Sequence, residues 1–160
     1  MHQTSPNYFR QQLISHINGG EAFTPIDKLL DKISFQKCGI IPEGLPYSLW
    51  QQLYHIRYTQ LDILEFIRNS AYKAPDWPDD YWPSNPYPDT EQEWEDMKKW
   101  YSQERRAIID IVKDESIDLF KPFPQGKGQT VFREALLIIE HTAYHTGQML
   151  ILMRLLDLYK

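Results

Sequence analysis

Three histidines are the residues of this chain whose types and spacing could support chemistry. His141 and His145 stand four residues apart in the segment Glu140-His-Thr-Ala-Tyr-His-Thr-Gly-Gln148. Residues i and i+4 lie on the same side of an α-helix, with Cβ atoms about 5–6 Å apart, so two such imidazoles can reach one metal ion. A third histidine from a neighbouring helix, His55, would complete three ligands and leave a fourth position open, as a catalytic zinc-type centre requires.

Spacing by itself leaves two interpretations open, because a histidine pair on a helix can also be two hydrogen-bonded core residues. The pair lies in a largely apolar helical line with Ile138, Met149 and Leu152. Two imidazoles in such a line are costly unless each finds a partner, which a metal ion would supply. The segment is not the H-E-x-x-H motif of zinc proteases, because Thr142 follows His141.

The elements that must position these histidines are helices. Residues 47–69 carry apolar side chains at intervals of three and four, which predicts a helix with one face in the core. Beside that face runs a polar stripe that contains His55, so we expect His55 to line a polar pocket; the stripe consists of Ser48, Gln52, His55, Thr59 and Asp62. A final helix is expected over residues 131–159, starting after Thr130. It is apolar nearly all round, which is typical of a deeply buried helix or of one that also covers a partner.

Further helices are expected over 7–18, 26–33 and 91–114, with start signals at Ser5-Pro6, Thr24-Pro25 and Asp89 or Thr90. Proline and glycine predict loops over 37–46, 74–90 and 120–129. We find no alternating pattern that indicates a strand. The expected fold is therefore all-α, an antiparallel four-helix bundle formed by one domain over residues 1–160.

The composition restricts the class of protein. A net charge of −5 and the absence of a basic run argue against nucleic acid as a partner. No apolar run of about 18 residues is present, so we expect no membrane span. One cysteine, Cys38, and an N-terminus without the pattern of a signal peptide lead us to expect a cytoplasmic protein.

Two segments together resemble the DinB/YfiT-like superfamily. The first is the stretch 140–148 quoted above, with Arg154 six residues further on; the second is Pro46-Tyr-Ser-Leu-Trp-Gln-Gln-Leu-Tyr-His-Ile-Arg57. Residues 75–83 are also similar to a loop in one bacterial branch of that family. The resemblance spans nearly the whole chain and implies a four-helix bundle, a homodimer, and a divalent metal ion held by His55, His141 and His145.

The resemblance implies several activities, because the family includes thiol-dependent transferases and isomerases, proposed hydrolases, and members without known activity. We expect a metal-dependent enzyme that activates a low-molecular-weight thiol for transfer to a small-molecule substrate. The alternatives are a hydrolase that activates water and a non-catalytic, stress-related metal-binding or interaction protein. Zinc and nickel are the expected metals, although imidazole also suits copper and iron.

Weaker candidates surround this predicted centre. Asp62 is a candidate base or supporting residue or else a solvated acid, and Gln148 a candidate at the mouth of the site or else a packing residue. The aromatic loop 77–87 either borders the metal pocket or covers the outside of the bundle. His2 and His16 have no partner at metal-ligand spacing, and Ser48 is better explained as a residue that starts a helix than as a nucleophile.

Overall fold

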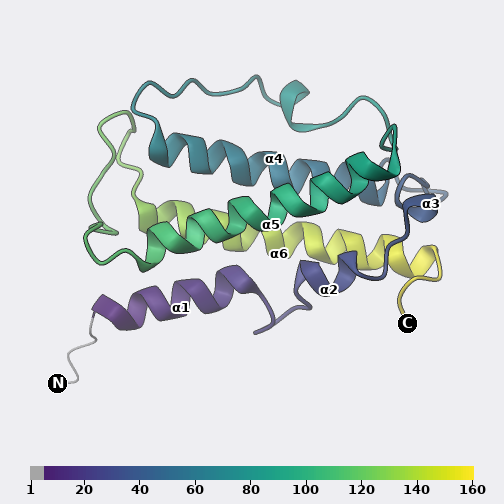
Figure 1. The fold of residues 1–160 in the computed structure, drawn as a ribbon, viewed down its shortest axis with the longest axis horizontal. Helices are drawn as coiled ribbons and strands as arrows, with labels where there is room; N and C mark the ends of the chain where they lie inside the picture. The colour runs from purple at the N-terminus through teal and green to yellow at the C-terminus, as the bar shows by residue number, and fades with distance from the viewer. Residues whose placement is uncertain (1–5) are drawn as a thin grey trace.

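The computed structural model describes residues 6–160, and in this range the chain forms helices and no strand. The expectation of an all-α fold is confirmed. Figure 1 shows the long helices lying side by side, with a long connection across the top. The long helices are α1 (Pro6–Asn18), α4 (Leu49–Arg68), α5 (Glu91–Lys113) and α6 (Val131–Leu155); the short ones are α2 (Ile26–Leu30), α3 (Phe35–Cys38) and the 3₁₀ turn η1 (Asp79–Tyr81).

The bundle pairs two parallel helices against two that run the opposite way. Trp50 contacts Trp94 near the start of both α4 and α5, and Arg57 is paired with Glu104 further along both, so α4 and α5 are parallel. The connection over residues 69–90 makes this possible, since it carries the chain back to the end where α4 began (Figure 1). Helices α1 and α6 run in the opposite direction (Figure 1). The bundle is therefore antiparallel between these two pairs, whereas α4 and α5, which are neighbours, are parallel.

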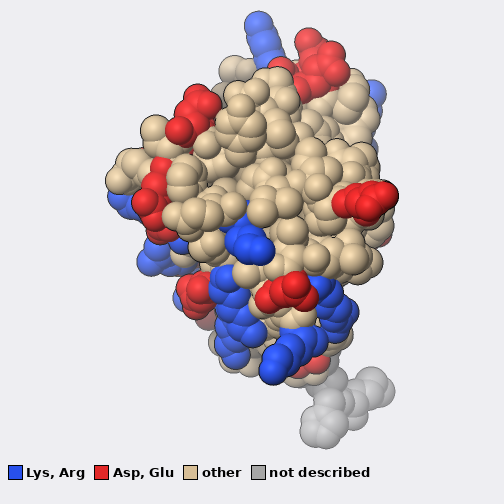
Figure 2. Space-filling model, turned by 90° about the vertical axis from the view of Figure 1, so that its right-hand side faces the viewer, with Lys and Arg blue, Asp and Glu red and all other residues tan. Residues whose placement is uncertain are grey.

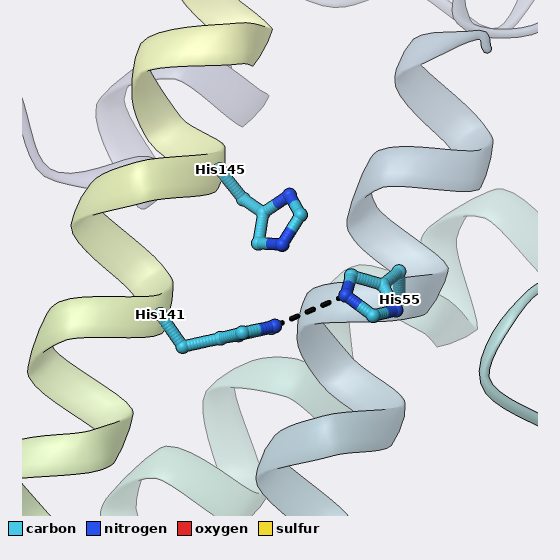
Figure 3. A group of neighbouring side chains, drawn as sticks. All are labelled: His55, His141 and His145. Carbon is cyan, nitrogen blue, oxygen red and sulfur yellow. Dashed lines mark hydrogen bonds between the residues drawn. The ribbon is translucent and has the colours of Figure 1, made fainter. Parts of the chain in front are cut away.

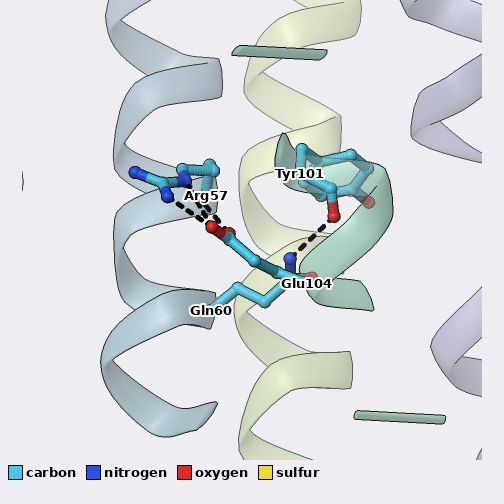
Figure 4. Close-up of polar contacts among 4 residues, drawn as sticks. All are labelled: Arg57, Gln60, Tyr101 and Glu104. Carbon is cyan, nitrogen blue, oxygen red and sulfur yellow. Dashed lines mark hydrogen bonds and ion pairs between the residues drawn. The ribbon is translucent and has the colours of Figure 1, made fainter. Parts of the chain in front are cut away.

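Polar contacts fix the register of α4 on α5 (Figure 4). The Gln60 amide donates to the Tyr101 carbonyl at 2.9 Å. One turn earlier, the Arg57 Nε donates to both carboxylate oxygens of Glu104 at 2.9 and 3.0 Å, and a second guanidinium nitrogen also contacts that carboxylate. Burial raises the pKa of Glu104, and the adjacent Arg57 opposes this effect. The pairing helps to hold α4, which carries His55, in a fixed position along the bundle.

Helix starts follow the expected signals in most cases. Ser48 and Gln51 form a reciprocal capping box at the start of α4, which confirms Ser48 as a helix-start residue. Thr90 and Thr130 accept from backbone amides three residues on and cap α5 and α6. Thr24 does not cap α2, whose N-cap is Pro25. The expected cap at Ser5 lies outside the described residues, as does His2.

Three other boundaries differ from those expected. The predicted loop over 37–46 overlaps helix α3, and the predicted helix 26–33 ends at Leu30. The final helix ends at Leu155 and not at Tyr159, because the chain turns at Asp157, which has a φ of 57°. There the Leu158 N–H donates to the Met153 carbonyl at 2.8 Å and closes the helix end.

A polar layer divides the interior of the bundle into two apolar clusters. One cluster is built around Leu53, Trp94 and Leu152, and the other around Leu64, Ile108 and Ile138. Between them lie buried polar side chains from three helices, namely Gln52, His55, Gln60, Arg105, Thr142 and His145. Because each buried polar group needs a partner, this layer is where the fold concentrates its polar interactions. None of the described helices combines the length and hydropathy that crossing a membrane would need.

Candidate metal centre

The structure brings the three predicted histidines together at one point. His55 extends from α4 and His141 and His145 from α6, and one ring nitrogen from each lies within 4.8 Å of the others. His55 and His145 are buried, with 2% and 6% of their surfaces exposed, and His141 is partly exposed. In Figure 3 the rings point toward one another across the gap between the two helices, and the Nε2 atoms of His141 and His55 are 3.0 Å apart.

Hydrogen bonds to the other ring nitrogens fix two of the three tautomers. The Nδ1 of His55 lies 3.2 Å from the Tyr81 carbonyl oxygen, and the Nδ1 of His145 lies 2.9 Å from Oε1 of Gln52. Carbonyl and amide oxygens only accept, so both Nδ1 atoms carry the proton. The Nε2 atoms of His55 and His145 are therefore left with lone pairs, and these are the atoms that a metal ion would bind.

Burial keeps the three imidazoles neutral. It lowers the pKa of His55, and it lowers the pKa of His141 to about 3, with a smaller contribution from His145 and His55. Burial, followed by the charge of His55, lowers the pKa of His145 to about 4. Neutral imidazole is the form that binds metals, so at neutral pH no proton has to leave the site before an ion enters.

The arrangement fits a divalent metal ion. Two nitrogens that share a tetrahedral zinc at 2.0–2.1 Å lie about 3.3–3.4 Å apart, close to the 3.0 Å observed between the Nε2 atoms of His55 and His141. Two ring nitrogens 3.0 Å apart cannot both present lone pairs to each other, so the lone pair on His55 Nε2 needs a proton or a metal ion as its partner. The Nε2–H of His141 is that partner here, and an ion could take its place if the proton of His141 were on Nδ1.

The aromatic loop over residues 77–87 lies directly against the centre formed by the three histidines. This agrees with the expectation that it borders the predicted pocket. The Trp82 ring stacks on His55 with ring centroids 4.0 Å apart and planes 4° from parallel. The rings of Trp77 and Tyr81 lie at 6.1 and 6.4 Å from the His55 ring. The loop thus covers one face of His55 and also supplies the Tyr81 carbonyl that orients it.

Asp62 holds this loop in place. Its two carboxylate oxygens accept hydrogen bonds from the hydroxyls of Tyr72 and Tyr81, at 2.5 and 2.7 Å. Burial is the main cause that raises the pKa of both tyrosines, and the hydrogen bond to Asp62 adds to it. With both oxygens engaged, Asp62 is placed to position Tyr81, and through it His55, which favours a supporting role over that of a free base.

The remaining candidates differ in their surroundings. Gln148 lies beside His145, and its side chain partly opposes the lowering of the pKa of His145; its amide nitrogen lies 3.4 Å from the Tyr144 hydroxyl. Cys38 is buried, and its thiol donates to the Phe35 carbonyl. Burial raises the pKa of this thiol to about 11, so it is not a reactive thiolate at neutral pH.

The sequence did not single out Gln52 and the Tyr81 carbonyl as partners of the histidines. Gln52 was visible in the polar stripe of α4, one turn before His55, which is the only signal that could have identified it. A backbone carbonyl carries no signal in the sequence, so the role of Tyr81 could be seen only in the structure.

Comparison with known proteins agrees with the geometry. A family model described as the DinB superfamily matches residues 23–149, a range that includes all three histidines. No curated protein and no solved structure matches the chain.

Proposed function

This chain belongs to the DinB superfamily, and we propose that it is a metal-dependent enzyme that uses His55, His141 and His145 to hold a divalent ion. The observation that carries the proposal is the convergence of three neutral imidazoles, two buried and one partly exposed, with one ring nitrogen from each within 4.8 Å of the others. Three neutral ligands leave the charge of the ion intact and an open position beside it, and an ion so held lowers the pKa of a bound thiol or water.

The preferred activity is transfer of a low-molecular-weight thiol to a small electrophilic substrate. This preference rests on the surroundings of the histidines. Glu140, the acid next to His141 in sequence, is exposed and lies about 100° around α6 from it, and both oxygens of Asp62 accept from tyrosines. A thiol needs no separate base once its pKa is lowered, whereas hydrolysis is helped by a positioned base. A hydrolase and a non-catalytic metal-binding protein are the alternatives.

The residues around the centre would each contribute to this activity in a distinct way. Gln52 and the Tyr81 carbonyl orient the imidazoles, and Trp82 covers one face of His55 and excludes water from it. Zinc and nickel are the proposed ions, since imidazole suits both.

The test uses the full chain loaded with zinc or nickel. Cysteine or glutathione is mixed with an alkylating electrophile, and the rate of thiol consumption is followed with and without the protein. We expect acceleration by the loaded protein and none by the His145→Ala variant. Equal rates for the two proteins would reject the thiol mechanism, and stoichiometric metal in a protein that accelerates neither thiol transfer nor ester hydrolysis would favour the non-catalytic alternative.

We further propose a homodimer formed through α6. Four large apolar side chains on this helix are at least 46% exposed and recur on one face, namely Leu136, Tyr144, Ile151 and Leu155. Gly147 lies on the same face with open space where a Cβ would be, which permits close approach of a second helix. An exposed apolar line of this kind is typical of an interaction surface.

A further inference from the structure

A cavity of about 480 Å³ lies next to the three-histidine centre and shares Trp82 with it. None of the three histidines lines this cavity, so it is a separate hollow. Its walls come from α4, from the connection that contains η1, and from the start of α5. The lining residues are Trp50, Tyr54, Tyr58, Asp79, Asp80, Trp82, Pro83, Ser84, Asn85, Tyr87, Asp89 and Glu93. Its volume is within the range of about 300–1,000 Å³ that small-molecule sites occupy.

Aromatic rings form much of the wall of this cavity. Tyr54 and Tyr58 stand one turn apart on α4 with centroids 5.8 Å apart and planes 8° from parallel. Trp50, Trp82 and Tyr87 complete the aromatic surface. Burial, followed by the negative charge of Asp80, raises the pKa of Tyr58, so its ring remains a neutral phenol. The faces of such rings carry negative electrostatic potential and attract cations.

Four carboxylates add negative charge, and the lining contains no lysine, arginine or histidine to balance it. Two of them are held in place by the backbone. The Asp76 N–H donates to Asp80 at 2.8 Å, and the Asp89 N–H donates to Glu93 at 2.6 Å. Their positions are therefore set before any ligand arrives, which reduces the entropy lost on binding.

Two cations on the adjoining helices are engaged elsewhere. Arg57 is paired with Glu104 on the α5 side of α4, and Lys98 is paired with Glu95. At the end of the bundle where α4 and α5 begin, Lys and Arg side chains gather mainly in the lower half, while the upper half is mostly uncharged, with acidic and a few basic side chains at its edges (Figure 2). The charged side chains that line the cavity are thus all acidic.

We propose that this cavity binds an organic cation, meaning the ammonium or quaternary ammonium group of a small molecule. The aromatic faces would hold the cation by cation–π attraction and the carboxylates would neutralise its charge. A hydrated metal ion would make no use of the aromatic walls, and an anion would be repelled. The inference goes beyond the proposed metal chemistry, because the cavity is formed without the three histidines.

The test compares choline with 3,3-dimethylbutan-1-ol, an uncharged molecule of the same shape. Both are titrated into the full-length protein at low salt, with and without a metal chelator, and binding is followed by calorimetry and ligand-observed NMR. We expect choline to bind at least about ten-fold more tightly than the alcohol, to the same extent in both conditions, and less tightly as salt is added. Retention of binding in the chelator separates this proposal from the fate of the metal site.

Variants assign the binding to the cavity. Asp80→Asn and Tyr58→Leu are each expected to weaken choline binding by about three- to ten-fold, whereas Tyr58→Phe keeps the ring and the affinity. Asp31→Asn is the matched control, since Asp31 is an exposed acid in a second hollow whose lining includes Lys98 and Lys99 and no aromatic residue. Asp80 is exposed, so its variant remains informative if Tyr58→Leu fails to fold.

Equal affinity for choline and the alcohol would overturn the proposal, because the cavity would then recognise shape and not charge. No saturable binding of choline, or an equal loss in Asp31→Asn and Asp80→Asn, would overturn it as well.

Discussion

Replacing Gln52 with leucine tests whether the polar layer exists to orient the metal ligands. Gln52 is fully buried, and its Oε1 accepts the Nδ1–H of His145 at 2.9 Å, while its own amide nitrogen has no partner. Loss of such an outer partner of a ligating histidine typically lowers metal affinity by about 10–100-fold, which corresponds to about 1.4–2.8 kcal/mol. We expect Gln52→Leu to fall within this range.

The same substitution should change the stability of the metal-free protein much less. Gln52→Leu leaves the Nδ1–H of the buried His145 without its acceptor, which costs about 1–3 kcal/mol. Removing the buried, unpartnered amide nitrogen of Gln52 returns free energy of a similar size, since a buried donor without an acceptor costs about 1–3 kcal/mol. The two effects oppose each other, so the net change in the free energy of unfolding should stay within about 1 kcal/mol. A loss of metal affinity without a loss of stability is therefore the expected signature.

The assay is competition of each variant with a calibrated zinc chelator, with urea denaturation of the metal-free protein in parallel. Gln52→Glu keeps an acceptor for His145 and is expected to bind at least as tightly as the wild type. Gln125→Leu is the control. Gln125 lies in the loop between α5 and α6, and its amide donates to the Phe66 carbonyl near the end of α4, about three turns beyond His55. Unchanged zinc affinity in Gln52→Leu would refute the role given to Gln52, and a strongly destabilised variant would show that its role is structural.

Four further predictions follow from the same structure. His145→Ala should lose stoichiometric metal by elemental analysis and keep the helical circular dichroism of the wild type, because each long helix has its own apolar face; metal retained at one equivalent would reject His145 as a ligand. The metal-free protein should lose stability as the pH falls below about 6.5, by up to about 1.4 kcal/mol per pH unit for each histidine. Stability falls as the pH falls because the pKa values of His141 and His145 in the folded protein, about 3 and about 4, lie below the value in the unfolded chain, so unfolding takes up protons. A urea midpoint that does not change between pH 7 and pH 5 would contradict this prediction. Arg105→Met should cost about 1–3 kcal/mol, because it leaves buried acceptors of Gln60, Thr142 and Ile17 without their donor. The exposed Arg106→Met is the control and should change the free energy of unfolding by less than about 0.5 kcal/mol. Light scattering at micromolar concentration should give the mass of a dimer for the wild type and of a monomer for Ile151→Glu; a monomeric wild type would exclude the homodimer.

The sequence predicted that the three histidines lie together, because helical spacing alone determines which face of a helix a residue occupies. His141 and His145 had to share a face at i and i+4, and His55 stood in a polar stripe beside the apolar face of its helix. Since both apolar faces had to meet in one core, the stripe and the pair could be expected to adjoin. The convergence of these three side chains is therefore predictable from local pattern.

The direction of α5 relative to α4 was not predicted, because it depends on the connection between them. A 20-residue helix is about 30 Å long, and the connection over residues 69–90 is long enough to return that distance. Long connections allow parallel neighbours and short ones enforce antiparallel pairs, so the length of this loop was the available signal.

The partners of the histidines and of Arg105 depend on contacts between residues far apart in sequence. Arg105 reaches the Ile17 carbonyl and Gln60 reaches the Tyr101 carbonyl, and backbone acceptors leave no pattern in a sequence. The cavity beside Trp82 arises in the same way, because its aromatic and acidic residues come from three separate segments.

A crystal structure of the zinc-loaded protein would show whether the three imidazoles bind one divalent ion. Data collected at the zinc absorption edge would locate the ion by its anomalous signal. We expect one strong peak with the Nε2 atoms of His55, His141 and His145 at about 2.0–2.1 Å and a fourth position free of protein ligands. A peak located only among surface carboxylates, or no peak between α4 and α6, would contradict the account.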